Sequence, residues 1–479
     1  MISDTHAYNI SQLLDNNNYT EVDRILELPS SGSGRIYFRI SFKDKSKENI
    51  IAAYNPETSE NIAQYSFTIH FLENGLRVPR IFAKDDSYKY FLLEDLGNTS
   101  MLDAIANMNW EEKLKLYKSV LNELIKFQFE GIKGLDLDVA WPVSKFERQN
   151  ILWDLNYFKY YFVKTHDSSF NEASLESDFQ KFSKTLLSTK SEFFLYRDFQ
   201  ARNIMLKENE PWFIDFQGGR QGPLQYDLVS LLYQAKANLS EDFRDLLFNY
   251  YISLLQSRSY ENIDDFKSNY SNFIWFRIMQ VMGAYGYRGI LQRKAHFLQS
   301  IPYVINIIKV LLNEKNLGPE FPELNSVFSQ ICELKDYCGI SVNDDKLVVS
   351  VNSFSYKKGG YPNDISGNGG GFAFDCRSLP NPGRYKELQD YTGRDKVVID
   401  FMKKNSVSKD FINQSYKLIQ PSVDNYLERN FKNLQINFGC TGGKHRSVYC
   451  AENIASMLED EYGEKIVVKL LHQQIEKGI

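Results

Sequence analysis

Residues 195–228 read LYRDFQARNIMLKENEPWFIDFQGGRQGPLQYDL, and the spacing of polar side chains in this stretch decides the expected fold. Asp198 follows an arginine, Asn203 comes five residues later, and Asp215 comes twelve residues after Asn203. Phosphoryl transfer from a nucleotide needs a carboxylate for the proton of the acceptor hydroxyl and oxygen ligands that hold Mg²⁺ against the phosphates. The spacing therefore predicts Asp198 as the catalytic base, with Asn203 and Asp215 as Mg²⁺ ligands.

The segment between Asn203 and Asp215 predicts a hairpin. Two short apolar runs, 204–206 and 212–214, flank a turn at 208–211, and such a hairpin brings the two ends of the segment together. An Asp-x4-Asn pair alone is a weak signal, but the flanking Arg-Asp and Ile-Asp-Phe sequences make the set specific. The alternative is a surface hairpin with three scattered acids.

Further motifs in the stretch resemble the kinases, and in particular the aminoglycoside-phosphotransferase branch. Gly-Pro at 222–223 and Tyr-Asp-Leu at 226–228 follow the Asp-Phe pair as they do in that branch. Arg-Asn at 202–203 and Ile-Asp-Phe-Gln at 214–217 are similar to the sugar anomeric kinase group typified by AmgK, which acts on N-acetylmuramate and N-acetylglucosamine. Tyr196 departs from the family, which usually has a histidine before Arg-Asp.

This resemblance implies a bilobal α+β kinase-like fold, ATP and Mg²⁺ as cofactors, and a sugar substrate phosphorylated at its anomeric hydroxyl. It implies that Arg202 acts beside Asp198, and that Arg202 or Arg197 steadies the loop or the transferred phosphate. The aromatic-rich helix predicted at 146–164 could hold a sugar, or it could be an ordinary core helix. The rival function is a non-catalytic regulator whose kinase fold only binds nucleotide.

A glycine-rich turn at 30–34 precedes the strand predicted at 35–42 and is a candidate cover for the nucleotide phosphates. Gly32 and Gly34 would let the backbone approach the phosphates closely. Tyr37 stands where a third glycine would complete the motif, so a plain hairpin turn explains this stretch as well.

The strand predicted at 49–54 lacks the lysine with which kinases usually pair the phosphates, and Arg39 or Arg35 could supply that charge. Glu94 and Leu96 lie in Leu-Leu-Glu-Asp-Leu-Gly, a sequence that resembles the connection between the two lobes. The backbone of this connection would meet the adenine edge. Upstream of these strands, apolar spacing predicts one helix over 9–27.

Residues 439–447, GCTGGKHRS, lie between a strand predicted at 434–438 and a helix predicted at 448–462. This order places backbone N–H groups and a helix N-terminus at an anion. The candidate anion or phosphate site comprises Cys440, Thr441, Gly442, Gly443, Lys444, His445, Arg446 and Ser447. The alternative is a tight turn with a solvated basic tip.

Two functions fit this turn. Cys-x5-Arg-Ser is the phosphate-loop pattern of cysteine phosphatases, in which Cys440 would be an acidified nucleophile and Asp375 the acid. Together with SFSYKKG, FDCRSLPNP and Thr-Gly-Arg-Asp at 392–395, however, the turn resembles the C-terminal domain of the RNase adapter protein RapZ over about 347–475. That resemblance implies a smaller α/β domain that senses a phospho-sugar or RNA and is not a phosphatase.

The 479 residues are expected to form a kinase-like domain at 1–320, with lobes 1–96 and 97–320, a linker at 321–340 and a RapZ-like domain at 341–479. No apolar run is long enough to span a membrane, so no membrane partner is expected. Five cysteines without Cys-x2-Cys pairs predict a cytoplasmic setting without structural zinc. A net charge of −5 argues against a simple polyanion binder, and no feature predicts the oligomeric state.

Overall fold

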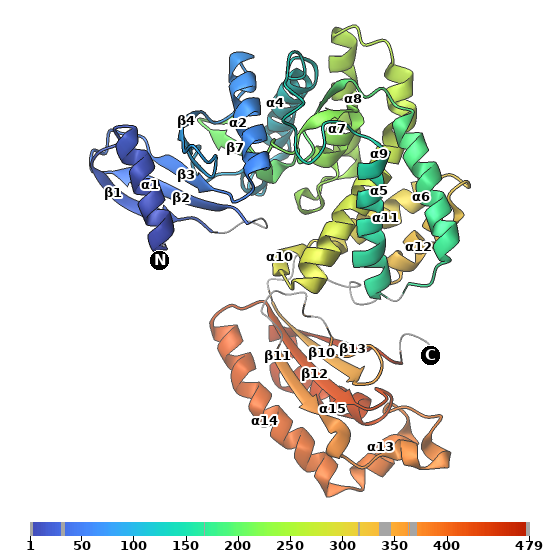
Figure 1. The fold of residues 1–479 in the computed structure, drawn as a ribbon. Helices are drawn as coiled ribbons and strands as arrows, with labels where there is room; N and C mark the ends of the chain where they lie inside the picture. Colours follow the sequence, from blue (N-terminus) through green and yellow to red (C-terminus); the bar gives the residue numbers. More distant parts are fainter. Residues whose placement is uncertain are drawn as a thin grey trace. The chain divides into compact units, whose positions relative to one another are not determined.

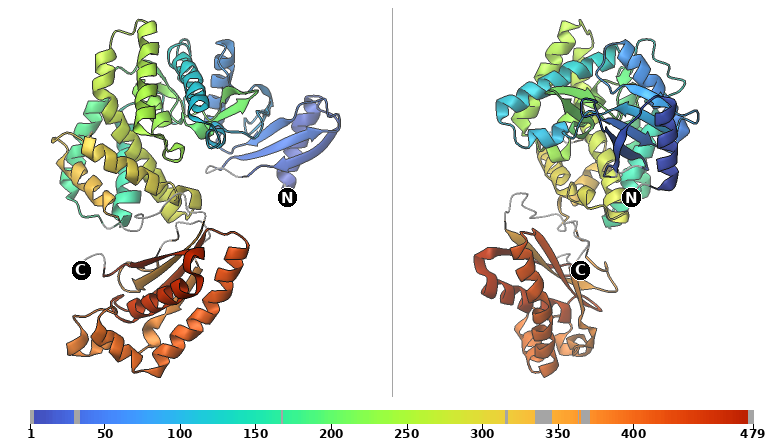
Figure 2. Two further views of the ribbon diagram at one scale, coloured as in Figure 1. Left: turned by 180° about the vertical axis from the view of Figure 1, so that it is seen from behind. Right: turned by 90° about the vertical axis from the view of Figure 1, so that its left-hand side faces the viewer.

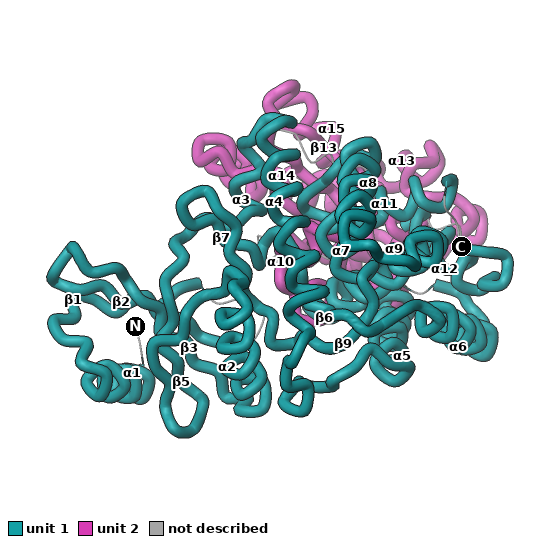
Figure 3. The backbone as a smooth tube through the Cα atoms, turned by 90° about the horizontal axis from the view of Figure 1, so that it is seen from above, with its two compact units in different colours: residues 1–288, 303–334 teal, residues 289–302, 335–479 magenta. Residues whose placement is uncertain are grey.

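The structure is a computed structural model that describes residues 3–29, 34–166, 168–314, 317–334, 346–362, 364 and 371–475. The chain divides into two compact units (Figure 3). Unit 1 comprises residues 1–288 and 303–334, and unit 2 comprises residues 289–302 and 335–479. Within the described ranges, no helix is both long and apolar enough to cross a membrane.

Unit 1 begins with a small lobe built on an antiparallel five-stranded sheet of order β1-β2-β3-β5-β4 (Figure 1). Its strands are β1 (Val22–Glu27), β2 (Ile36–Phe42), β3 (Ile50–Tyr54), β4 (Ile81–Lys84) and β5 (Tyr90–Glu94). The alternating residues Phe38, Ile40 and Phe42 of β2 are buried and pack with Ile10 and Leu13 from helix α1 (Asp4–Asn16). Helix α2 (Thr58–Glu73) connects β3 to β4.

The helix predicted over 9–27 is wrong in its second half. Helix α1 ends at Asn16, within a run of three asparagines, and Asn18 and Glu21 both have positive φ angles, of 60° and 62°. Residues with φ > 0 cannot continue a right-handed helix. The chain therefore turns, and Val22–Glu27 pairs with β2 as an antiparallel edge strand.

The large lobe of unit 1 is mainly helical, and two short two-stranded sheets carry the predicted catalytic stretch. Strand β6 (Phe193–Leu195) pairs with β9 (Arg220–Gly222), and β7 (Ile204–Lys207) pairs with β8 (Glu210–Phe213), which confirms the predicted hairpin. Helix α9 packs against both α5 and α7. The principal helices are α3 (Met101–Ile105), α4 (Trp110–Phe129), α5 (Arg148–Phe158), α6 (Glu172–Leu187), α7 (Gln225–Leu232), α8 (Glu241–Ser257), α9 (Ile263–Tyr285), α11 (Ile301–Glu314) and α12 (Pro322–Cys332).

Helix α12 occupies the first half of the predicted linker at 321–340. Asp178 of α6 accepts hydrogen bonds from the N–H groups of Glu323 and Leu324, at 2.9 and 3.1 Å, and so caps the start of α12. Val327 and Phe328 are fully buried. The linker prediction is therefore wrong up to Cys332, because α12 is packed into unit 1, while 335–340 lies outside the described residues.

Unit 2 is a smaller α/β domain with a four-stranded sheet of order β11-β12-β10-β13. All three strand pairs are parallel, and the strands are β10 (Leu347–Ser355), β11 (Gly371–Asp375), β12 (Asn433–Cys440) and β13 (Ile466–His472). Helix α15 (Arg446–Tyr462) packs across β10, β12 and β13, and α14 (Ser406–Glu428) lies beside it (Figure 2). Helix α13 (Lys396–Lys403) packs against both α14 and α15. The predicted fold classes of both parts are thus confirmed.

Candidate active site

The predicted catalytic loop, which follows β6 and carries Asp198, has a conformation that one buried carboxylate fixes. Asp227, in the first turn of α7, accepts hydrogen bonds from the backbone N–H groups of Tyr196 and Arg197, at 2.7 and 3.0 Å. Arg197 has a φ of 81°, which non-glycine residues adopt only when their surroundings impose it. Its guanidinium forms an ion pair with Asp154 of α5 at 3.0 Å. Arg197 therefore holds the loop in place.

Asp198 projects from this loop with 39% of its side chain exposed, so a substrate can reach it. Its Oδ1 lies 3.7 Å from a guanidinium nitrogen of Arg277, which is buried in α9. Burial alone would raise the pKa of Asp198, but the surrounding arginines, Arg277 first and Arg202 next, lower it below its ordinary value. The carboxylate therefore stays ionised and can accept a hydrogen bond from a substrate hydroxyl.

Asn203 lies between the two acids of the catalytic stretch. Its Nδ2 donates to the backbone carbonyl of Asp198 at 2.9 Å and to Oδ2 of Asp215 at 3.2 Å. The β7–β8 hairpin brings Asn203 close to Asp215, and Ile214 N–H donates to the Asn203 carbonyl at 3.1 Å. With Nδ2 committed to these acceptors, Oδ1 is the amide atom left for a cation.

The donor set of Asn203 and Asp215 fits Mg²⁺, which prefers oxygen ligands and usually takes one or two from the protein and the rest from phosphates and water. Asp215 has a φ of 69°, and the hydroxyl of Tyr196 donates to the carbonyl of the preceding Ile214 at 2.7 Å. Tyr196 therefore supports the backbone beside Asp215. No cluster of three or more histidine, cysteine or acidic ligands occurs within the described residues.

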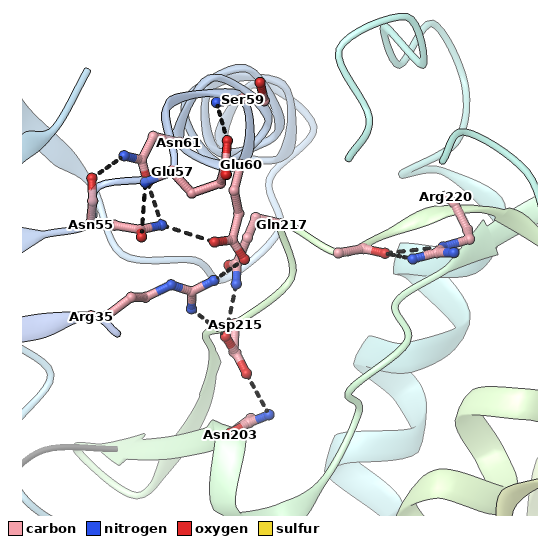
Figure 4. Close-up of polar contacts among 11 residues, drawn as sticks. Arg35, Asn55, Glu57, Ser59, Glu60, Asn61, Asn203, Asp215, Gln217 and Arg220 are labelled. Atoms are coloured by element: carbon pink, nitrogen blue, oxygen red, sulfur yellow. Dashed lines mark hydrogen bonds and ion pairs between the residues drawn. The ribbon is translucent and has the colours of Figure 1, made fainter. Parts of the chain in front are cut away.

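A buried arginine from the small lobe contacts Asp215 (Figure 4). Arg35, directly before β2, donates from one terminal nitrogen to Asp215 Oδ1 at 2.7 Å and from the other to Glu60 of α2. Asn55 holds Glu60 from the opposite side at 2.9 Å, and Gln217 donates to Asp215 at 2.8 Å. Although β3 lacks a lysine, Arg35 from the segment before β2 thus contacts Asp215.

The other small-lobe candidates lie elsewhere. Arg39 forms an ion pair with Asp95 at 2.6 Å and donates to the Gly97 carbonyl at 3.0 Å, so it braces the connection between the lobes. The Glu94 carboxylate accepts from Lys207 at 2.7 Å, and its backbone N–H donates to the Arg80 carbonyl at 2.9 Å. The carboxylate and the backbone N–H of Glu94 therefore both form hydrogen bonds within the protein.

Three further candidates differ in their surroundings. Leu96 is buried at the connection between the lobes. Gly34 is exposed, with open space around the position of a Cβ. Gly32 lies outside the described residues.

The predicted anion loop of unit 2 wraps around the end of β12. Cys440 is buried, its Sγ lies 3.1 Å from Oγ of Ser447 and it accepts a hydrogen bond from Gly443 N–H at 3.2 Å. Gly443 has a φ of 66°, and a Cβ there would come within 3.1 Å of Ser355. The Ser355 hydroxyl donates to the Thr441 carbonyl at 2.7 Å, so the loop is tied to the end of β10.

The basic side chains of this loop point to backbone carbonyls. Arg446 donates to the carbonyl of Arg377 at 2.9 Å, and Lys444 donates to that of Gln389 at 2.8 Å. His445 contacts the Leu388 carbonyl at 3.1 Å. These contacts fasten the segment 377–389 to the loop. The predicted role of the three side chains as donors to an anion stays a prediction.

Asp375 is poorly suited to be the acid of a cysteine phosphatase. Its carboxylate is bound by the guanidinium of Arg377 at 2.6 Å. The hydrogen bond from Arg377 lowers the pKa of Asp375 below its ordinary value, so the group carries no proton to donate near neutral pH.

Comparison with known proteins agrees with this geometry. Residues 31–264 match the model of the phosphotransferase enzyme family, and residues 347–476 match that of the RapZ C-terminal domain. The chain therefore contains a phosphotransferase-like domain and a domain similar to the RapZ C-terminal domain. The phosphotransferase-like domain is the one that contains the Asp198, Asn203 and Asp215 cluster.

The phosphotransferase-like domain has a named relative that it matches over most of that relative's length. The N-acetylmuramate/N-acetylglucosamine kinase of Neisseria meningitidis serogroup B is 26% identical over 311 residues, which cover 63% of this chain and 87% of the relative. Among solved structures, the gentamicin complex of APH(2")-IIa is 12% identical and covers 67% of this chain and 99% of its own, with a TM-score of 0.43.

The RapZ-like domain matches proteins described as nucleotide-binding. The one from Fervidobacterium nodosum is 36% identical over 137 residues, which cover 28% of this chain and 45% of the relative. The one from Pseudothermotoga lettingae is 30% identical over 163 residues, which cover 33% of this chain and 56% of the relative. The chain therefore spans only about half the length of these relatives.

Two residues at the candidate active site were missed by sequence reasoning. Glu60 pairs with Arg35, and Arg277 faces Asp198. Neither belongs to a local motif, and only the fold brings them to the site. Arg202, which was predicted, lies exposed in the catalytic loop and acts on Asp198 through its charge.

Proposed function

We propose that the phosphotransferase domain transfers the γ-phosphoryl group of ATP to the anomeric hydroxyl of an amino sugar of the N-acetylmuramate or N-acetylglucosamine type. The observation that carries this proposal is the position of Asn203, whose amide contacts both Asp198 and Asp215. This arrangement sets an acceptor for a hydroxyl proton beside a pair of oxygen ligands for a metal. The relative from Neisseria supports the choice of amino sugar.

Each group has a distinct task in this proposal. Asn203 and Asp215 would hold Mg²⁺, which neutralises charge on the phosphates when it is bound. Asp198 orients the acceptor hydroxyl and receives its proton as the bond to phosphorus forms. Because its pKa is lowered, Asp198 is a weak base, and we infer that orientation is its larger contribution. Arg202, which is exposed beside Asp198, is placed to meet the charge of the transferred group.

The test measures ATP consumption by the full chain with a panel of amino sugars, and ³¹P NMR identifies the position of the new phosphate. We expect sugar-dependent turnover that falls by ~10²–10⁴-fold in Asp198→Asn. Asp86→Asn, an exposed acid on the turn between β4 and β5, serves as the matched control and should keep wild-type turnover. Turnover absent with every sugar, alongside normal ATP binding, would instead support a non-catalytic nucleotide-binding regulator.

For unit 2 we propose binding of a phosphorylated amino sugar at the 439–447 loop. The loop connects a strand to the N-terminus of α15, where backbone N–H groups and the helix dipole favour an anion. Recognition of RNA at this loop is the alternative that the RapZ match leaves open. Phosphatase chemistry at Cys440 is disfavoured, because Asp375 is paired with Arg377.

Calorimetric titration of the full chain with an amino-sugar phosphate and with single-stranded RNA separates these ligands. Saturable heat with the sugar phosphate, lost in Gly443→Ala, would support the proposal. Binding of RNA alone would overturn it. Use of ATP, together with a sequence that has no Cys-x2-Cys pair, makes the cytoplasm the location that we propose.

A further inference from the structure

Within the part of the chain that the structure describes, Arg35 bridges two carboxylates, and one of its own nitrogen atoms is left without a partner. Only 11% of its side chain is exposed, and its two terminal nitrogens bind Asp215 and Glu60. Its Nε is buried without a hydrogen-bond partner among the described residues. A buried donor without a partner costs free energy. In its present position, Arg35 therefore has a donor, Nε, that no described residue uses.

Burial alone would lower the pKa of Arg35, but Tyr37, Asp215 and Glu60 raise it above its ordinary value. The guanidinium therefore always carries its charge. Two carboxylates share this one cation, and the cluster as drawn in Figure 4 has an excess of negative charge.

The two carboxylates are held differently. Glu60 is fixed in the first turn of α2, where Asn55 donates to its second oxygen at 2.9 Å. Asn55 is itself bound to Asn61, whose Nδ2 donates to the Asn55 carbonyl at 2.8 Å and to that of Tyr88 at 2.6 Å. Glu60 thus rests on a closed polar network and can keep hold of Arg35.

Asp215 does not depend on Arg35 for its position. Gln217 and Asn203 also donate to its carboxylate, at 2.8 and 3.2 Å, and both would remain if the guanidinium left. However, Arg35 binds Oδ1 of Asp215, and the proposed function assigns this carboxylate to Mg²⁺. A guanidinium and a divalent cation on one carboxylate repel each other.

We propose that Arg35 is an exchangeable cation of the nucleotide site: it neutralises Asp215 when nucleotide is absent, and it moves to the nucleotide phosphates when Mg²⁺ takes Asp215. Glu60 is the fixed pivot of this movement. Arg35 would thereby supply the phosphate-pairing charge that β3 lacks, from a position at the start of β2. This inference rests on the proposed function for the identity of the nucleotide and the metal.

The exchange makes two opposite predictions for one substitution. In Arg35→Gln, Asp215 loses its resident counter-cation, so Mn²⁺, used as a spectroscopic probe for Mg²⁺, should bind the nucleotide-free protein at least threefold more tightly. ATP in the presence of Mg²⁺ should bind at least tenfold more weakly, because the phosphates lose a cation. A purely structural role would weaken both affinities together.

Electron paramagnetic resonance of free Mn²⁺ measures the first affinity, and calorimetric titration measures the second. Arg77→Gln is the matched control, since Arg77 forms an ion pair with Glu210 and should change neither affinity. Arg35→Lys keeps the charge, is the fallback if the glutamine variant does not fold, and should keep ATP affinity closer to wild type. Parallel loss of both affinities, or no change in either, would overturn the exchange. Neither readout needs a sugar, so failure to find an acceptor leaves this test intact.

Discussion

Removal of the Tyr196 hydroxyl tests the support beneath Asp215. This hydroxyl donates to the Ile214 carbonyl at 2.7 Å, and the ring is buried among Phe127, Phe199 and Phe216. Burial, together with the nearby acids, raises the pKa of Tyr196 well above its ordinary value, so the hydroxyl keeps its proton and donates. Tyr196→Phe leaves the packing intact and removes this one bond.

The expected loss of stability follows from the burial of the Tyr196 hydroxyl and of the Ile214 carbonyl that accepts from it. A net hydrogen bond contributes ~0.5–1.5 kcal/mol, and an unpaired buried carbonyl raises the cost to ~1–3 kcal/mol. For a unit of this size, that corresponds to a fall in Tm of roughly 2–6 °C. Because Asp215 follows Ile214 directly, ATP turnover should fall as well.

Tyr117→Phe is the matched control. Tyr117 is also fully buried in unit 1, but its hydroxyl has no hydrogen-bond partner among the described residues. Its removal should leave the Tm unchanged or raise it slightly, because an unsatisfied polar group is lost. Differential scanning calorimetry of the full chain makes the comparison, with the unit 1 transition identified by its shift with ATP and Mg²⁺. Equal shifts in the two variants would refute the role assigned to Tyr196.

Two further substitutions test the loops. Burial raises the pKa of Asp227 to about 7 in the folded protein, so the folded state binds this proton more tightly than the unfolded state does. The resulting stability is fully present below pH ~4 and is lost as the pH rises to ~7, by at most ~1.4 kcal/mol per pH unit. Asp227→Asn should flatten the Tm profile over that window, and an unchanged slope would contradict the assignment. Gly443→Ala should destabilise unit 2 by more than ~1 kcal/mol and lower its Tm, because a side chain at a φ of 66° is strained and contacts Ser355. Gly442→Ala is the control: its Cβ would lie in open space, so the Tm should not change. Equal effects of the two alanines, measured by the same calorimetry, would count against this account of the loop.

The sequence was sufficient for the fold classes and for the proximity of Asp198, Asn203 and Asp215, because both depend on local patterns. Asn203 and Asp215 are joined by a short hairpin, so their approach follows from turn chemistry alone. The partner of Asp215 could not be predicted in this way. Arg35 lies 180 positions away, and only the packing of the small lobe decides whether Arg35 or Arg39 reaches the site.

The basic residues of the unit 2 loop show a second limit. Lys444, His445 and Arg446 form a local motif that is typical of anion binding, but their side chains contact carbonyls of 377–389. A motif gives the backbone conformation of a loop more reliably than the direction of its long side chains. The catalytic, metal and nucleotide roles of individual residues therefore stay predictions until the variants are measured.

The strand order of unit 2 has a consequence for how the chain folds during synthesis. Its first strand, β10, is flanked on both sides by strands that are made much later, β12 and β13, and β11 pairs only with β12. The sheet therefore cannot begin to form around β10 until β12 has left the ribosome, whereas the small lobe pairs β1, β2 and β3 consecutively. Until then β10 remains unpaired while unit 1 can already assemble, so chaperone dependence should be concentrated in unit 2.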